Sequence, residues 1–297
     1  MTSDYALGER LLACFAALDE HFGHEPHWWP VITDDPPFEV LVGAILVQQT
    51  RWETVEAAVA RLRDAGLMSP FALATADIDA LAALIRPCAF HAQKAAGLHA
   101  ICCDIAQQYE CDTTRLLTGA RNEVRARLLA LPRIGRETAD TIMLYGGGWP
   151  VFVVDAYTRR LFARLDLAPG FDFLRAPYDV VQHLIECALH PFLPGTTTIA
   201  AENFHVHRTV ETNGNGAFFF AQFHALIIEA CVHHCLARNP RCNQPGVRRT
   251  FIDPRKCADH CLTCHECPLC QRCAAFNGRV TSCRDAASPV RVQADRA

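Results

Sequence analysis

The sequence is nearly free of lysine. Lys94 and Lys256 are the only two among 297 residues, so arginine supplies almost all of the positive charge. The chain opens without a charged segment followed by an apolar one, and no apolar run reaches about 18 residues, so we expect neither a signal peptide nor a membrane span. Internal repeats and low-complexity tracts are also missing. We therefore predict a cytoplasmic globular protein that has no contact with a membrane.

Strand patterns are scarce as well. Apolar residues recur at helical spacing over most of the chain, and no segment shows a convincing alternation of apolar and polar residues. Hydrophobic residues make up 51% of the chain and charged residues 20%, which suffices for one large core or two modest ones. The pattern predicts an all-α fold, with helices at residues 5–22, 38–50, 53–65, 77–86, 92–109, 121–130, 156–165, 177–189 and 218–236.

Cysteine is abundant in one region. Of the 16 cysteines, ten fall between Cys231 and Cys283. Disulfides are rare in a reducing compartment, so this clustering indicates a metal centre rather than crosslinks. The six cysteines of the first 230 residues are scattered, and we expect them to be buried as small hydrophobic side chains.

A short turn and a single carboxylate stand out in the middle of the chain. Residues 131–145 place Gly135 at the tip of a turn that opens a helix. The backbone N–H groups of Ile134, Gly135 and Arg136 would there face a phosphate at a helix N-terminus, without reading any base. After a short apolar run, Asp155 precedes the next helix. A plain helical turn and an N-cap aspartate are the structural alternatives.

The Leu-Pro-x-Ile-Gly-x-x-Thr-Ala hairpin at residues 131–139 and the Gly-Trp-Pro-Val-Phe-Val-Val-Asp run at 148–155 resemble the helix-hairpin-helix and catalytic loop of the endonuclease III family of DNA glycosylases. The resemblance implies a two-lobed helical fold, with residues 35–147 in one lobe and residues 1–34 plus 148–297 in the second. It implies a monomer that binds double-stranded DNA containing a damaged base and, in a bacterium, is associated with the nucleoid. Asp155 would be the catalytic residue, stabilising the oxocarbenium-like sugar or activating water.

Two residues depart from the family pattern. Arg133 stands where relatives usually have glycine, so it needs acceptable backbone angles and could add a phosphate contact. Glu137 stands where the bifunctional members carry the lysine that attacks the sugar, and glutamate cannot form an imine. Because only Lys94 and Lys256 could replace that amine, we predict a monofunctional glycosylase without lyase activity.

The resemblance also assigns residues that handle the base. Gln49 falls where relatives place a side chain that fills the gap left by a flipped nucleotide. The candidate base pocket consists of Trp28, Trp29, Trp52, Glu137 and Tyr157, although the adjacent Trp28 and Trp29 could equally plug a core.

Several short motifs are closest to the branch of the family that removes 3-methyladenine. Alkylated purines carry positive charge, and tryptophan faces attract them by cation–π stacking worth about 2 kcal/mol when desolvated. A monofunctional mismatch glycosylase for adenine, uracil or thymine and a non-catalytic iron–sulfur DNA-binding protein are the alternatives.

The cysteine-rich region resembles the family's [4Fe–4S] loop, because the segment 235–242 has its Cys-x6-Cys opening and its Pro-Arg-Cys ending. The continuation comes only after an insertion. Four thiolates suffice for the cluster, and the resemblance implies Cys235, Cys242, Cys267 and Cys273, with Cys264 as the alternative to Cys242. The remaining cysteines have the ligand type and spacing of a second, structural Zn²⁺ site, or else are spare thiols; that site would use Cys257, Cys261, Cys264 and Cys270.

Overall fold

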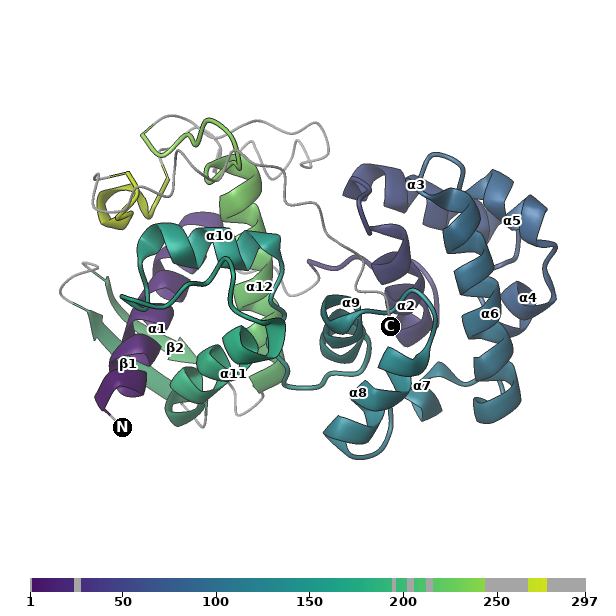
Figure 1. Cartoon of the computed structure of the whole chain (residues 1–297), viewed down its shortest axis with the longest axis horizontal. Helices are drawn as coiled ribbons and strands as arrows, with labels where there is room; N and C mark the ends of the chain where they lie inside the picture. Colours follow the sequence, from purple (N-terminus) through teal and green to yellow (C-terminus); the bar gives the residue numbers. More distant parts are fainter. Residues whose placement is uncertain are drawn as a thin grey trace. The chain divides into compact units, whose positions relative to one another are not determined.

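The structure is a computed structural model that describes residues 2–23, 28–193, 196–201, 206–211, 216–243 and 267–276, with backbone alone for 2–4 and the two strands. Internal contacts divide the chain into two compact units (Figure 1). The hairpin unit comprises Glu25–Val153 and Asn215–Ala221, and the aspartate unit comprises Met1–His24, Val154–Gly214 and Gln222–Ala297. The sequence placed the boundaries of the first lobe at residues 35 and 147, whereas the contacts place them at 25 and 153.

The hairpin unit is built around one apolar helix. Every residue of α2 from Phe38 to Leu46 is buried, because α3, α6 and η1 pack around it. Side-chain caps from Asp35, Ser69 and Asp77 begin three of the helices. The elements are α2 (Pro36–Leu46), α3 (Trp52–Asp64), α4 (Pro70–Thr75), α5 (Ile78–Leu84), α6 (His91–Tyr109), α7 (Thr113–Leu116), α8 (Arg121–Ala130), α9 (Arg136–Thr141) and the π-helical turn η1 (Ile142–Gly146).

The aspartate unit has an aromatic core. Phe223 of α12 lies 5.6 Å from Phe15 of α1 and 5.9 Å from Phe162 of α10, and Phe162 meets Phe173 at 5.7 Å between ring centroids. All four rings are buried, and α11 packs against α1. The elements are α1 (Thr2–Phe22), α10 (Ala156–Leu165), α11 (Tyr178–Leu189), η2 (His190–Phe192), α12 (Gly216–His233) and η4 (Cys270–Arg272); the first six residues of α12 belong to the hairpin unit.

A two-stranded sheet contradicts the expectation that the chain has no strands. β1 (Thr196–Ala201) pairs antiparallel with β2 (Val206–Glu211), with Thr198 opposite Thr209, and both strands contact α1. β1 begins with three threonines and an isoleucine, and such β-branched residues favour strands even where they do not alternate with polar ones. The mostly helical architecture is confirmed and is consistent with the all-α prediction, which lacked only these two strands.

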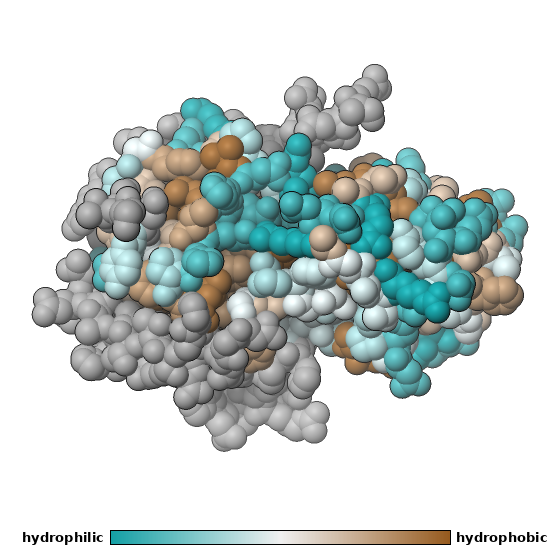
Figure 2. Space-filling model, turned by 90° about the horizontal axis from the view of Figure 1, so that it is seen from below, coloured by the Kyte–Doolittle hydropathy of each residue, from teal (hydrophilic) through white to brown (hydrophobic). Residues whose placement is uncertain are grey.

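Among the described residues, α12 alone has the length and apolar composition of a helix that could cross a membrane. The fold buries 72% of its most apolar window, as it does for the core helix of a globular protein. On the described part of the face in Figure 2, hydrophobic residues are scattered among hydrophilic ones. We therefore interpret α12 as a core helix.

Candidate active site and cysteine segment

The turn between α8 and α9 exposes its tip and buries one anchor. Ile134 is only 6% exposed, whereas Arg133, Gly135 and Arg136 are exposed. Arg133 has φ = +66°, in the left-handed region that glycine adopts without steric cost. The side chain of Arg133 lies over Gly97 of α6, where an added Cβ would come 2.6 Å from Arg133 Cγ. The turn therefore forms with arginine in a backbone conformation that favours glycine, and the small Gly97 leaves room for its side chain.

A buried lysine holds the loop that follows α2. Nζ of Lys94 donates to the backbone oxygens of Leu46 and Gln48, at 2.7 Å each, and to Oγ1 of Thr50 at 3.0 Å. Lys94 has no exposed surface, and burial lowers its pKa to about 8. Its three bonds satisfy acceptors at the C-terminal end of α2, where a helix leaves carbonyls without partners. Between these acceptors Gln49 is exposed, with φ = +54°.

A glutamine connects this loop to the hairpin. Nε2 of Gln48 donates to the backbone oxygen of Arg133 at 2.9 Å and to Oγ1 of Thr138 at 3.1 Å. The loop with Gln49 and the hairpin with Arg133 are therefore parts of one hydrogen-bonded frame, which Lys94 anchors in the core of the hairpin unit.

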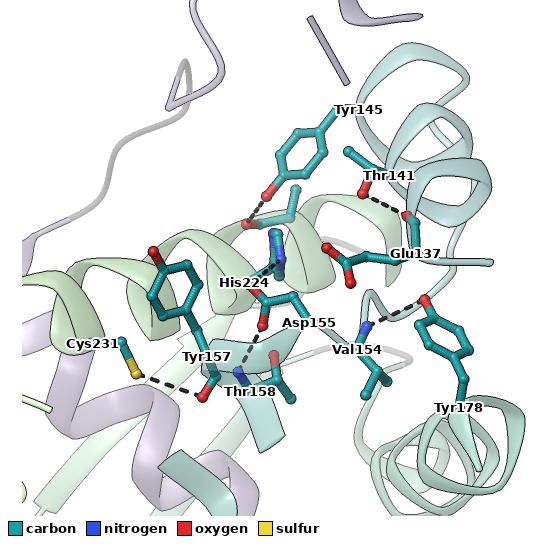
Figure 3. Close-up of polar contacts among 11 residues, drawn as sticks. Glu137, Thr141, Tyr145, Val154, Asp155, Tyr157, Thr158, Tyr178, His224 and Cys231 are labelled. Atoms are coloured by element: carbon teal, nitrogen blue, oxygen red, sulfur yellow. Dashed lines mark hydrogen bonds and ion pairs between the residues drawn. The ribbon is translucent and has the colours of Figure 1, made fainter. Parts of the chain in front are cut away.

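The predicted tryptophans gather around a tyrosine that the sequence did not single out. Tyr145, on the π-helical turn η1, lies 5.2 Å from Trp29 and 6.1 Å from Trp28, and Trp29 meets Trp52 edge-to-face at 5.1 Å. The Tyr145 hydroxyl donates to the backbone oxygen of Ala221 at 3.1 Å (Figure 3). Short π-helical turns occur frequently at functional sites. The hairpin unit thus holds an aromatic cluster of Trp28, Trp29, Trp52 and Tyr145.

This aromatic cluster leaves little open space in the structure. The Trp29 indole packs on α2 at Gly43, where an added Cβ would lie 3.0 Å from its ring. The cavity beside Trp29 and Trp52 has a volume of about 20 Å³, enough for a water molecule but not for a purine. A base that stacks here would need the tryptophan side chains to move apart.

The other two predicted pocket residues, Glu137 and Tyr157, do not belong to this aromatic cluster. Glu137 is exposed in the first turn of α9, and its backbone oxygen accepts a hydrogen bond from Thr141 Oγ1 at 2.8 Å. Tyr157 belongs to the aspartate unit, where the Arg160 guanidinium covers its ring at 5.0 Å from the centroid. The structure therefore divides the predicted base-pocket residues between the two units.

Asp155 is a buried carboxylate at the N-terminus of α10. Its Oδ1 accepts the backbone N–H of Thr158 at 2.7 Å, as an N-cap does, and its Oδ2 lies 3.6 Å from Nε2 of His224 on α12 (Figure 3). Burial alone would raise the pKa of Asp155, but the His224 imidazole and the Thr158 N–H outweigh it and hold the pKa below its ordinary value. Capping thus fixes the carboxylate and, with His224, keeps it ionised.

The four cysteines expected to bind iron all lie within the described residues and are buried. The backbone N–H of Cys267 donates to the Cys242 oxygen at 3.1 Å, which joins the two halves of the segment. At the end of α10, Arg164 Nη1 donates to Cys235 Sγ at 3.1 Å, and the Arg164 backbone oxygen accepts from Cys273 Sγ at 3.5 Å. α10 therefore holds both ends of the cysteine segment.

Two of the four cysteines have a lowered pKa, which favours metal binding. The thiol of Cys231, together with Arg164, lowers the pKa of Cys235 to about 6, and that of Cys242 lowers the pKa of Cys273 to about 7. Thiolates are the form that binds metal. Burial raises the pKa of Cys267 to about 12, and the hydrogen bond with Cys273 raises that of Cys242.

In the part of the chain that the structure describes, no three cysteine, histidine or acidic side chains lie close enough to share a single metal ion. The four buried cysteines match a [4Fe–4S] cluster in ligand type and number. The alternative ligand Cys264 and the second-site residues Cys257 and Cys261 lie outside the described residues. Cys270, the fourth member of that second set, is buried.

The family of the chain follows from two comparisons. Residues 42–185 match the model of the HhH-GPD superfamily of base excision DNA repair proteins. The chain is 32% identical over 228 residues to a protein of Methanocaldococcus jannaschii named as a DNA repair glycosylase, and the match covers 76% of this chain and 89% of that relative. The chain belongs to the HhH-GPD superfamily.

Further relatives of this HhH-GPD protein are similar over shorter stretches or in structure. Endonuclease III of Escherichia coli is 28% identical over 147 residues, which are 50% of this chain and 65% of that enzyme. The structure of H. pylori 3-methyladenine DNA glycosylase bound to 1,N6-ethenoadenine matches with a TM-score of 0.59 and 26% identity, covering 75% of this chain and 95% of that one. The chain is a DNA glycosylase of the endonuclease III-like group.

Three residues of this glycosylase were missed by sequence reasoning. Gln48 was hidden beside the exposed Gln49, and Tyr145 had no distinguishing neighbour in the sequence. His224 carried a signal that was not used, because it is a histidine in the middle of the apolar stretch Phe218–Ala230. A polar side chain at a buried helical position needs a partner, and the sequence does not say which one.

Proposed function

We propose that the protein is a monofunctional glycosylase that hydrolyses the N-glycosidic bond of a damaged base in double-stranded DNA. The main support for this proposal is that Asp155 is a buried carboxylate whose pKa is held below its ordinary value. An ionised carboxylate in a low-dielectric site stabilises positive charge on the sugar as the bond to the base breaks. The same carboxylate can accept a proton from the attacking water.

A covalent route through an amine has little support from the described residues. Glu137 occupies the position of the family's lysine nucleophile. Lys94 is fully buried and its three N–H groups donate to Leu46, Gln48 and Thr50, so its lowered pKa does not make it available to a sugar. Lys256 lies outside the described residues.

The substrate that we propose is an alkylated purine such as 3-methyladenine. An aromatic cluster with three tryptophans favours a cationic base, because π-faces attract positive charge. A cationic base also leaves the sugar without strong acid assistance. The bound 1,N6-ethenoadenine in the H. pylori relative supports a purine lesion. We propose that Gln49 fills the gap that a flipped nucleotide leaves in the duplex. We propose that the turn contacts a DNA phosphate through Arg133, Ile134, Gly135 and Arg136.

Release of free base from a panel of duplexes tests this function. The panel contains 3-methyladenine, 7-methylguanine, hypoxanthine, uracil, a G·T mismatch and adenine opposite 8-oxoguanine. We expect release from the alkylated duplexes, and a decrease of at least about 100-fold in Asp155→Asn. Asparagine caps a helix as well as aspartate does, so this variant should fold. Release from the mismatched duplexes alone would replace the proposed substrate with the mismatch alternative, and an active Asp155→Asn would exclude Asp155 as the catalytic residue.

We also propose a [4Fe–4S] cluster held by Cys235, Cys242, Cys267 and Cys273. When bound, it would crosslink segments that lie about 30 residues apart in the sequence and so stabilise the end of the aspartate unit. Purified protein should contain about four irons per chain. Cys235→Ser should lose them, whereas Cys103→Ser on α6 should keep them. Iron-free native protein would contradict the cluster, and one equivalent of zinc beside the iron would support the second site.

A further inference from the structure

α12 contains a buried polar residue next to the candidate catalytic carboxylate. His224 is 4% exposed and Asp155 is 7% exposed, and Nε2 of His224 lies 3.6 Å from Oδ2 of Asp155. The neighbouring Phe223 belongs to the aromatic core of the aspartate unit. An ionisable pair in such surroundings costs free energy unless its members face each other with opposite charge or through a shared proton. The burial of His224 beside Asp155 therefore indicates a polar role that an apolar residue could not perform.

We propose that His224 is a positioning residue for Asp155 in base release. This inference rests on the proposed catalytic role of Asp155. The two carboxylate oxygens have different partners, since Oδ1 accepts the Thr158 N–H and Oδ2 faces the His224 ring (Figure 3). Partners on both oxygens fix the plane of the carboxylate, which the N-cap bond alone does not. A fixed plane keeps the negative charge directed at the sugar without reorganisation during the reaction.

The electrostatic effect of His224 on Asp155 also supports this role. Burial of Asp155 favours its neutral form, and the imidazole opposes that tendency. His224, which faces Oδ2 from α12, is thus the partner that opposes the effect of burial on the pKa of Asp155.

The test compares two variants in single-turnover base release over a range of pH. His224→Gln keeps an N–H donor near Oδ2, and His224→Met fills a similar volume without one. We expect His224→Met to slow release by about 10- to 100-fold, with the acid limb of the pH profile displaced to higher pH. We expect His224→Gln to restore most of the rate. Affinity for DNA with an abasic-site analogue should be unchanged in both, and His183→Met, an exposed histidine of α11, should behave as wild type.

A wild-type rate and acid limb in His224→Met would overturn the proposal, as would equal losses in both variants. If His224→Met does not fold, nuclear magnetic resonance of the His224 ring decides in the absence of DNA. At a fixed pH, the chemical shifts of the ring should change in Asp155→Asn if the pair exists, and unchanged shifts would overturn the pair. If the wild-type protein releases no base from any duplex, the proposed function fails, while the chemical shifts of the His224 ring still test the pair.

Discussion

The two units fix their candidate functional residues by different means. In the hairpin unit, Lys94 and Gln48 bind mainly to backbone oxygens and so fix the course of the chain at Gln49 and at the turn. In the aspartate unit, Asp155 has one bond to the backbone and one side-chain partner from α12, about 70 residues later in the sequence. A frame that holds the backbone suits contacts with a phosphate, whereas a side-chain pair suits a group whose charge and direction matter. Substitutions should therefore affect folding in the first unit and chemistry in the second.

Among substitutions in the hairpin unit, the largest effect on stability is expected for Lys94→Met. The substitution leaves three acceptors without the ammonium, two of them backbone oxygens, and each buried acceptor without a partner costs about 1–3 kcal/mol. We expect the free energy of unfolding to fall by about 3 kcal/mol or more in urea denaturation. Arg63→Met, on the surface of α3, is the control and should change it by less than about 0.5 kcal/mol. A Lys94→Met protein as stable as this control would show that the frame contributes nothing.

The pH dependence of stability provides a second test of Lys94. The pKa of Lys94 is about 8 in the folded chain, below its ordinary value of 10.5. Between these values the unfolded chain binds more protons than the folded one, so stability should rise as the pH rises through this interval. The rise should be smaller in Lys94→Met than in Arg63→Met when both are measured across that range. Identical slopes would mean that Lys94 titrates normally.

A smaller effect is expected for Gln48→Ala, which removes the link between the loop and the hairpin. Two hydrogen bonds are lost, so the free energy of unfolding should fall by about 1–2 kcal/mol. Affinity for DNA containing an abasic-site analogue should fall with it, while the single-turnover rate at saturating DNA is retained. Gln108→Ala, exposed on α6, should change neither quantity. A lower single-turnover rate at saturating DNA would show that Gln48 affects base release as well as DNA binding.

The smallest effect is expected for Arg133→Gly. Glycine relieves the left-handed backbone at φ = +66°, so stability should be unchanged or raised by up to about 1 kcal/mol. If Arg133 contacts a phosphate, the dependence of DNA affinity on salt should weaken by about one unit of slope. Arg133→Ala loses the same charge and keeps the strained backbone, so it should share the slope but not the added stability. An unchanged slope in both variants would remove Arg133 from the DNA contacts.

Local sequence patterns predicted much of the fold and of the turn. The spacing of apolar residues predicted most of the helices, because the buried face of a helix has an apolar residue in each consecutive turn. The unusual Arg133 was visible because the hairpin motif has a fixed length. The strands at 196–211 were missed because β1 does not alternate, although its threonines favour a strand.

Partners far apart in the sequence could not be predicted. The contact of His224 with Asp155 depends on how α12 packs against α10, and the bonds from Lys94 depend on how α6 packs against α2. Neither packing has a local signature. The tryptophans were predictable as a group, but the structure adds Tyr145 to them and places Tyr157 in the other unit.

We propose that this glycosylase releases a base by hydrolysis, with Asp155 as its charged group and no amine in the reaction. Incubation with alkylated duplex DNA in the presence of borohydride tests it most directly, because borohydride reduces any imine between protein and sugar to a stable crosslink. Hydrolysis without an amine should yield free alkylated purine, an unbroken strand with an abasic site, and no crosslinked protein. A crosslink formed in proportion to base release would contradict it.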